Sequence, residues 1–298
     1  MSEHINVLDR PLAIGGHVSL MHRLVRSPGA LTSGAILLAF AAIALFAPLL
    51  APHDPYVQDI SRRLLQPIGY ARHDPVHLLG TDAFGRDYLS RLIYGTRVAL
   101  IIGVCVMLLS GILGTTLGMI AGFYGGRIDQ ILMFVINTRL ALPVFLVAMA
   151  VVVVFGASLL VTILILGLFQ WDRFVIVARS ATQQSVGLDY VQAARAIGAS
   201  GARILATEIL PNILDALIVI ATIEMAYAIL LESALSFLGF GVQEPTASWG
   251  LMLAQARQYM FFDAWLLYIP GLALLILVLA INVFGDSLRD LLGRGNGR

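Results

Sequence analysis

Residues 97–123 read RVALIIGVCVMLLSGILGTTLGMIAGF, and this stretch decides the fold class. After its first residue it carries no charge, and it is longer than the ~20 apolar residues that one helix needs to cross ~30 Å of hydrocarbon. Gly114, Gly118 and Gly122 recur at every fourth position, so they lie on one face where another helix can approach closely. The stretch therefore predicts a membrane-spanning helix that packs tightly through its glycines.

The whole composition is typical of a membrane protein. Hydrophobic residues form 59% of the 298 positions and charged residues 12%, whereas an average soluble domain has roughly 45–50% and about 25%. The net charge of +1 and the lack of a basic stripe interleaved with aromatics argue against nucleic-acid binding. Cys105 is the only cysteine, so an intrachain disulfide and a thiolate metal cluster are both excluded.

The predicted fold class is an all-α membrane protein with about six transmembrane helices. The first apolar run begins too late and continues too long for an ordinary cleaved signal peptide, so it is expected to be retained. The predicted spans are residues 31–50, 97–123, 131–155, 159–178, 213–240 and 265–284.

The arginines next to these spans predict the orientation. All 19 basic residues are arginine, and 12 of them fall on one side of the predicted spans against 7 on the other. The richer side is expected to be cytoplasmic, which places both termini there. The predicted division of the chain is a cytoplasmic segment 1–30, a first transmembrane helix 31–50, a periplasmic loop 51–96 with a short surface helix at 82–94, a five-helix core 97–285 that includes a cytoplasmic loop 179–212 and a periplasmic loop 241–264, and a cytoplasmic tail 286–298.

The cytoplasmic loop 179–212 contains a short helix with its own start and stop signals. Asp189 is expected to be the N-cap, and Gln192, three residues later, can bond back toward the cap backbone. Gly198 is expected to end the helix. A second short helix over residues 200–209 is expected to end at Pro211, where the chain turns into the fifth span.

A helix this short needs something to pack against, because isolated helices below ~12–15 residues are marginal in water. Ala193 and Ala194 permit close approach, while Tyr190, Val191 and Ile197 offer apolar anchors. This pattern suits a helix inserted into a groove on another protein. An ordinary loop helix packed on the inner surface of the same chain is the alternative.

These residues also carry a resemblance to a known family. Val191-Gln192-Ala193-Ala194, Gly198 and Ile209-Leu210-Pro211 resemble the cytoplasmic EAA loop of bacterial ABC importer permeases. Gln192 stands where that family usually has glutamate, which removes a charge that can pair with the motor subunit. Further matches indicate the second, C-type permease of dipeptide, oligopeptide and nickel importers: residues 77–82 (HLLGTD), 85–87 (GRD), 90–92 (SRL), 235–239 (LSFLG), 248–250 (SWG), 285–286 (GD) and 288–290 (LRD), together with Asn282.

The resemblance implies a type I ABC importer permease fold in a bacterial inner membrane. It also implies a sister permease subunit, two ATPase subunits and an extracytoplasmic solute-binding protein as partners. This chain has no lysine, so it cannot carry a standard Walker A motif; ATP and Mg²⁺ are expected on the partner subunits, and this chain is expected to hold no cofactor and to perform no catalysis. The residues expected to couple to the ATPase are Asp189, Tyr190, Val191, Gln192, Ala193, Ala194, Arg195, Ile197, Gly198 and Pro211.

Two ionisable residues lie inside the predicted fifth span. Glu224 and Glu232 are costly there, and such groups usually face a water-filled path or a partner. Both are candidates for lining the solute path, and a hydrogen bond to a neighbouring helix or to the sister subunit is the alternative for each. His73 and His77 are four residues apart, but Pro75 between them opposes a regular helix, so no metal site is expected.

Two other classes of function compete with an ATP-driven permease. An ion- or proton-coupled secondary transporter could use the two glutamates, although the sequence shows no clear internal repeat of the kind that such transporters often have. An intramembrane enzyme would be expected to carry an HExxH motif or a serine–histidine pair, and no histidine falls in a predicted span. The solute itself stays open, from dipeptides to nickel chelates.

Overall fold

Long apolar helices account for most of the architecture. The computed structural model describes residues 27–293, and within them the secondary structure is helical apart from two isolated β-bridges in the loop after α3. The long elements are α2 (Pro28–Leu45), α4 (Tyr88–Tyr124), α5 (Gly126–Leu140), α6 (Val144–Phe155), α7 (Leu159–Phe169), α8 (Asp172–Val186), α11 (Leu210–Phe237) and α13 (Trp265–Gly293). The short ones are α3 (Ala47–Leu50), η1 (Ile60–Arg62), α9 (Asp189–Ala196), α10 (Gly201–Arg203), η2 (Ile204–Ile209) and α12 (Trp249–Ala256).

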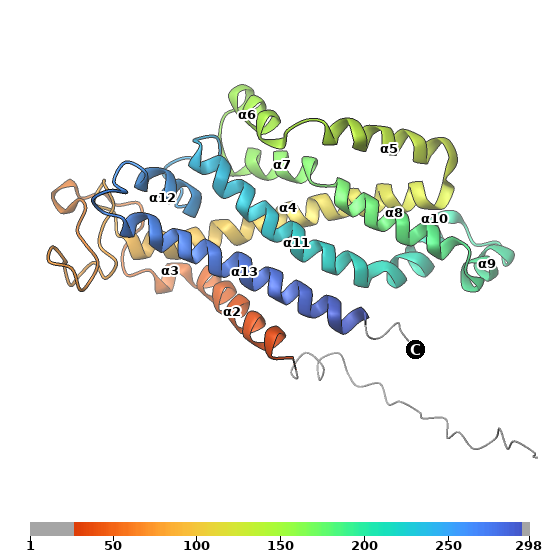
Figure 1. Ribbon diagram of the computed structural model, residues 1–298, viewed down its shortest axis with the longest axis horizontal. Helices are drawn as coiled ribbons and strands as arrows, with labels where there is room; N and C mark the ends of the chain where they lie inside the picture. The colour runs from red at the N-terminus through yellow and green to blue at the C-terminus, as the bar shows by residue number, and fades with distance from the viewer. Residues whose placement is uncertain (1–26, 294–298) are drawn as a thin grey trace, which may run out of the picture.

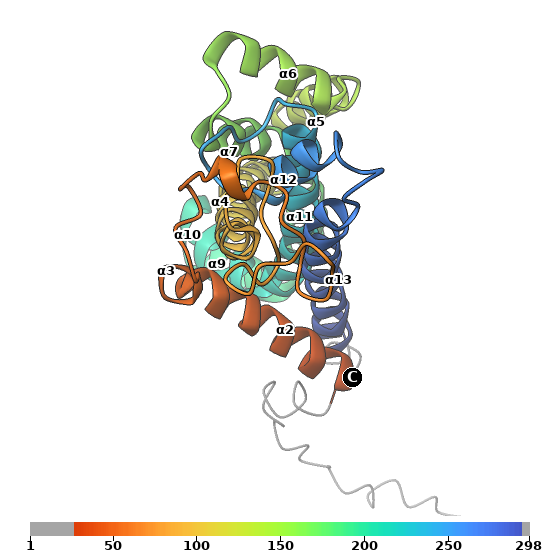
Figure 2. The same ribbon diagram turned by 90° about the vertical axis from the view of Figure 1, so that its left-hand side faces the viewer.

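Except for α6, the long helices lie roughly along one axis, with α4 and α11 in the middle. In Figure 1, α2 and α13 flank one side of this pair, and α5 and α6 lie on the other side. Figure 2, a view along the long axis, shows the same order from bottom to top. The loop 51–87 and α12 lie at one end of the molecule, which we call the α12 end. Helix α9 projects at the opposite end, which we call the α9 end. The buried apolar clusters lie where α4 and α11 pack against α12 and α13, against α6 and α7, and against α8 and α9.

Five helices in the described range are long and apolar enough to cross a membrane, and a sixth crossing depends on a bent pair. The third predicted span, residues 131–155, is wrong as a single helix: α5 and α6 meet at 83°. Pro143 lies at this break and lacks the N–H that would continue the α5 ladder. Figure 2 shows α6 lying across the top of the bundle.

The predicted surface helix at residues 82–94 is also wrong. The Asp87 carboxylate accepts a hydrogen bond from the Ser90 backbone N–H at 2.8 Å, so α4 begins at Tyr88 and continues without a break to Tyr124. The preceding residues form a loop, since Gly85 adopts a positive φ of 74° in contact with the backbone of Asp59.

Glycine contacts between α4 and α8 confirm the predicted tight packing. A Cβ at Gly118 would lie 2.6 Å from the Val175 carbonyl oxygen, and one at Gly122 would lie 2.7 Å from the Arg179 carbonyl oxygen. Because only glycine permits this separation, the two helix backbones touch directly.

Buried charges hold the loop 51–87 against the loop that precedes α12. Arg86 donates from Nε to Asp82 at 2.6 Å and from Nη2 to Glu244 at 3.1 Å. Trp249, the first residue of α12, donates from Nε1 to the Leu92 carbonyl at 3.0 Å. The predicted pairing of Asp82 with Arg86 is thus present, but it is buried between segments and does not lie on a surface helix.

Two predicted segment boundaries also change. The segment 1–30 lies mostly outside the described residues, and its last residues begin α2. The predicted tail 286–298 is part of α13 as far as Gly293, and residues 294–298 lie outside the described range.

Candidate functional site

The helix at residues 189–196 exists, but its start differs from the prediction. Leu188 is the N-cap and Asp189 the first helical residue, and the Asp189 side chain makes no capping hydrogen bond. Gln192 donates from Nε2 to the Val186 carbonyl at 2.9 Å, so it does not return to the cap backbone. The physical reason is the tight turn between α8 and α9, which leaves an unpaired carbonyl at the end of α8 within reach of the amide.

The predicted stop at Gly198 is confirmed. Gly198 has a φ of +83°, its N–H bonds to the Arg195 carbonyl at 3.0 Å, and the Ala199 N–H bonds to the Ala194 carbonyl at 3.0 Å. This pair of bonds is a Schellman motif, which satisfies the last carbonyls of the helix. A residue with a left-handed conformation is required at this position.

Burial divides α9 into two faces. Val191 and Ala194, three residues apart, are buried against Ile204 and Ile209 and their neighbours in the same chain. Gln192 and Ala193, and Ile197 just past the end of α9, are exposed, and the Ile197 side chain is 85% exposed. Val191 and Ala194 are therefore used within this chain, because the i, i+3 spacing turns them toward the bundle, as the alternative of a loop helix packed on the same chain predicts. Contact of α9 with another protein stays a prediction.

Two more of the predicted coupling residues, Tyr190 and Arg195, pack against other parts of this chain. The Arg195 guanidinium lies over the Phe123 ring, 4.8 Å from its centroid, at the end of α4. Tyr190 is half-buried and packs against the same apolar cluster. Both contacts hold α9 to the end of the bundle.

Pro211 is not the end of a separate short helix. Gly201 to Phe237 is one continuous helical segment, in which η2 is a π turn with a Leu210 N–H to Leu205 carbonyl bond. Proline has no N–H to donate to the carbonyl four residues before it. A π turn fits at such a position, because its hydrogen bonds reach five residues back instead of four. The chain after α9 is therefore one helical segment that continues into α11, and α9 packs on η2 in its first part.

Glu224 forms an ion pair between two membrane-spanning helices. Its carboxylate is 1% exposed and accepts from Arg173 Nη1 of α8 at 2.9 Å. The Arg173 guanidinium also lies 4.8 Å from the centroid of the Tyr227 ring. A charge inside the bilayer is thereby compensated within this chain.

Glu232 is surrounded by hydroxyl groups. Its Oε1 accepts from Ser236 at 2.7 Å and from Ser248 at 3.2 Å, and its exposed fraction is 1%. Ser248 is the N-cap of α12, so this carboxylate links the end of α11 to α12. The predicted alternative of a hydrogen bond to a neighbouring element is present for both glutamates, and lining of a solute path stays a prediction.

The structure does not bring the predicted coupling residues and the two glutamates together. Pro211 and Glu232 lie at opposite ends of α11, about 30 Å apart at 1.5 Å per residue. Sequence reasoning missed Arg173 as the partner of Glu224 and Ser248 as a partner of Glu232. No local pattern marks either pair, since 51 and 16 residues separate the partners.

Replacing Arg173 with alanine is expected to destabilise the protein. Breaking a fully buried ion pair costs about 3–5 kcal/mol, and the expected loss lies below that range because the Arg173 side chain is 44% exposed. Thermal unfolding in detergent measures the change. In a Glu224→Gln background the same substitution should cost less, and equal costs in both backgrounds would show that the two side chains are not coupled.

Gly198→Leu is expected to fray the end of α9 while the protein remains in the membrane. A left-handed conformation costs a non-glycine residue roughly 1–2 kcal/mol, so the two hydrogen bonds of the Schellman motif should open more often. Hydrogen exchange of residues 189–199 measures this opening. Gly198→Asn is the control, because asparagine adopts this conformation more readily, and unchanged exchange in a well-expressed leucine variant contradicts the expectation.

The fold and the site define a multi-pass helical membrane protein with a short helix exposed at one end of its spans. The sequence family described as "binding-protein-dependent transport system inner membrane component" matches residues 114–298, a range that contains α9 and both glutamates. This chain belongs to that family and is a permease subunit of a binding-protein-dependent transporter. The N-terminal transmembrane domain of oligopeptide transport permease C matches residues 19–67.

Curated relatives resemble the chain over most of its length. The dipeptide transport system permease protein DppC of Haemophilus influenzae is 42% identical over 264 residues, which cover 89% of this chain and 90% of the relative. The di/tripeptide transport system permease protein DppC of Pseudomonas aeruginosa is also 42% identical, over 89% of this chain and 87% of that protein. The probable D,D-dipeptide transport system permease protein DdpC of Escherichia coli is 36% identical over 92% of this chain and 90% of that protein.

A solved structure shares the fold. A chain of the MetNI methionine ABC transporter in an inward-facing conformation superposes with a TM-score of 0.55 at 19% identity, covering 67% of this chain and 96% of that one. The ABC importer permease fold expected from the sequence is thereby confirmed.

Proposed function

We propose that this chain is the C-type permease subunit of an ATP-driven importer for dipeptides, oligopeptides or related small solutes. The observation that carries the proposal is the exposed face of α9, an apolar tip at the end of a helix that packs on η2, the segment that continues into α11. Relatives named as dipeptide and di/tripeptide permeases support the solute class.

In this proposal α9 is the contact with a separate ATPase subunit. Ala193 and Ile197 enter a groove on that subunit, while Val191 and Ala194 keep the helix attached to the permease. Closure of the ATPase pair on ATP and Mg²⁺ moves α9, and the buried face passes the movement to the start of α11. ATP then biases the equilibrium between inward-open and outward-open states, to the extent that it binds one state better.

The other parts of the transporter follow from the family. The chain pairs with a sister permease in the bacterial inner membrane, two ATPase subunits bind at the α9 end, and a solute-binding protein docks at the α12 end. The α9 end, toward which α2 begins and α13 ends, is cytoplasmic. The family assignment gives no support to a secondary transporter driven by an ion gradient.

Cysteine crosslinking tests the proposed contact. In a Cys105→Ser background, single cysteines at Ala193 and Ile197 should crosslink to an ATPase subunit in membranes that contain the assembled transporter, and ATP should change the yield. A cysteine at Ile60, which is 68% exposed at the α12 end, is the control and should not crosslink to it. Absence of any second polypeptide at positions 193 and 197 would refute the proposal.

The solute class needs its own measurement. Reconstituted vesicles with the complete transporter should take up di- or oligopeptides only with ATP inside and the binding protein outside, and vanadate should stop uptake. Uptake driven by a proton gradient without ATP is the result that would favour the secondary transporter.

A further inference from the structure

Three potential metal ligands meet at the α12 end from segments that are separate in the sequence. His53 follows α3, His77 lies in the loop 51–87, and Asp87 is the N-cap of α4. One ligand atom from each lies within 4.8 Å of the others. His77 Nδ1 is 2.9 Å and His53 Nδ1 3.6 Å from the same oxygen, Asp87 Oδ1.

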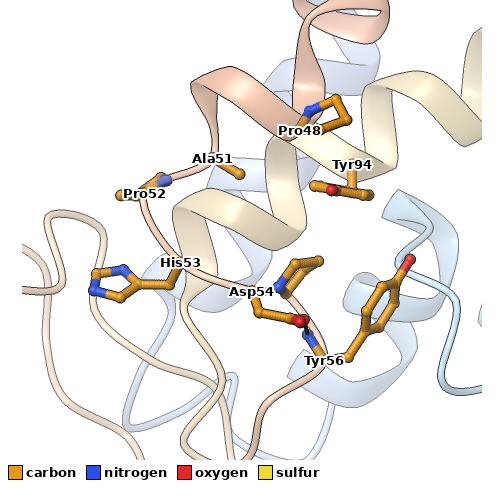
Figure 3. A pocket seen from close by; sticks show the side chains of 8 residues that line it. Pro48, Ala51, Pro52, His53, Asp54, Tyr56 and Tyr94 are labelled. Carbon is orange, nitrogen blue, oxygen red and sulfur yellow. Dashed lines mark hydrogen bonds between the residues drawn. The ribbon is translucent and has the colours of Figure 1, made fainter.

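His53 has a buried nitrogen without a partner. Its Nδ1 is shielded from solvent and makes no hydrogen bond within residues 27–293. Figure 3 shows the imidazole turned away from Tyr56 and Tyr94, and its ring centroid lies 4.8 Å from that of His77. A buried polar atom left unpaired costs about 1–3 kcal/mol, so this arrangement favours a third atom between the two rings and the carboxylate.

The surroundings are suited to a cation. A cavity of about 260 Å³ adjoins the cluster, and three carboxylates line it against one guanidinium. Of these, Asp59 accepts a hydrogen bond from the Ser61 hydroxyl, which lowers the pKa of Asp59 and keeps it ionised. The lining thus carries net negative charge, and the cavity gives an ion a route from solvent.

We propose that His53, His77 and Asp87 form a binding site for a divalent transition metal, with Zn²⁺ as the best fit. Two imidazoles, one carboxylate and an open position for water match the three-ligand zinc sites of proteins. Zinc–ligand distances near 2.0–2.2 Å imply ligands about 3.3 Å apart, so the three side chains need to close by about 1.5 Å at most. Calcium and magnesium fit less well, because both prefer oxygen ligands.

The metal would join two pieces of the loop to the start of a spanning helix. His53 follows the first span, and Asp87 is the N-cap of α4, so the ion would link the first span to α4 through the intervening loop. This inference does not depend on the solute or on the ATPase, because the site lies at the opposite end of the molecule from α9.

Zinc binding to the purified, chelator-treated protein tests the proposal. We expect one equivalent of Zn²⁺ per chain by calorimetry and elemental analysis, and a tetrahedral absorption spectrum with Co²⁺. Changing even an outer partner of a metal ligand costs about 10–100-fold in affinity, so His53→Ala, which removes a ligand, should weaken binding at least ~100-fold. Since the His53 side chain makes no hydrogen bond, this variant should fold normally, which gel filtration checks.

His73→Ala is the matched control. His73 is an exposed histidine of the same loop that bonds to the Tyr70 carbonyl, outside the cluster, so its loss should leave the affinity unchanged. The proposal is overturned if the wild-type protein binds no stoichiometric metal, or if both variants bind Zn²⁺ equally well. In either case Asp87 only caps α4 and pairs with His77. The wild-type stoichiometry decides the question even if a variant fails to fold.

Discussion

Gly118→Leu is expected to prevent stable packing of α4 on α8. A Cβ at this position would lie 2.6 Å from the Val175 carbonyl oxygen and 2.9 Å from the Ala178 Cβ, so both the backbone and a side chain of α8 block it. Overpacking of a core costs about 1–3 kcal/mol, and contact with backbone that cannot move aside places this substitution at or above the upper end. The thermal midpoint and the monodisperse yield in detergent should both fall sharply.

Gly187→Leu is the control for that experiment. Gly187 follows α8 directly, has no positive φ, and no atom of the described residues lies within 4 Å of a Cβ built there. Its substitution should leave the thermal midpoint nearly unchanged. Equal losses for the two variants would mean that the glycine face of α4 does not set the distance between the helices.

Ile197→Asp is expected to weaken the proposed contact with the ATPase subunit about 10–100-fold without unfolding the protein. The side chain is 85% exposed in the isolated chain, so its replacement removes no internal contact of note. Burying an isoleucine on a partner contributes about 1.5–3 kcal/mol. Since 1.4 kcal/mol is tenfold in affinity, the ATPase subunit should bind about 10–100-fold more weakly and ATP-dependent uptake should fall accordingly.

The matched control is Ile60→Asp. Ile60 is 68% exposed at the other end of the molecule, so the same change of side chain should leave ATPase binding and assembly intact. Binding is measured by titrating the ATPase subunit onto the purified permease. This measurement distinguishes a weaker contact from a lower yield of the variant. Unaltered binding by Ile197→Asp would show that the tip of α9 is not the contact.

Apolar composition predicted most of the spans, because a bilayer requires every crossing segment to be long, uncharged and internally hydrogen-bonded. The regular spacing of Gly114, Gly118 and Gly122 likewise predicted a packing face before its partner was known. Gly198 was predicted as a helix end for a local reason, namely that only a few residue types adopt a left-handed conformation. These features depend on neighbours within a few residues.

The errors arise where distant residues compete with local preferences. Asp189 has the usual chemistry of an N-cap, yet the turn after α8 places Leu188 there and directs Gln192 to the Val186 carbonyl. Residues 131–155 are apolar throughout, but the break before Pro143 folds them into two helices. Composition cannot distinguish one straight span from two helices of the same total hydropathy.

Short-range chemistry accounts for the membrane class, most of the long apolar segments, the glycine face and the end of α9, since each follows from residues that are close along the chain. The pairing of Arg173 with Glu224, the two faces of α9 and the meeting of His53 with Asp87 are different, because their partners come from elements that only packing brings together. A side chain's neighbours across the bundle depend on the rotation and bend of every intervening helix, and no local pattern specifies these.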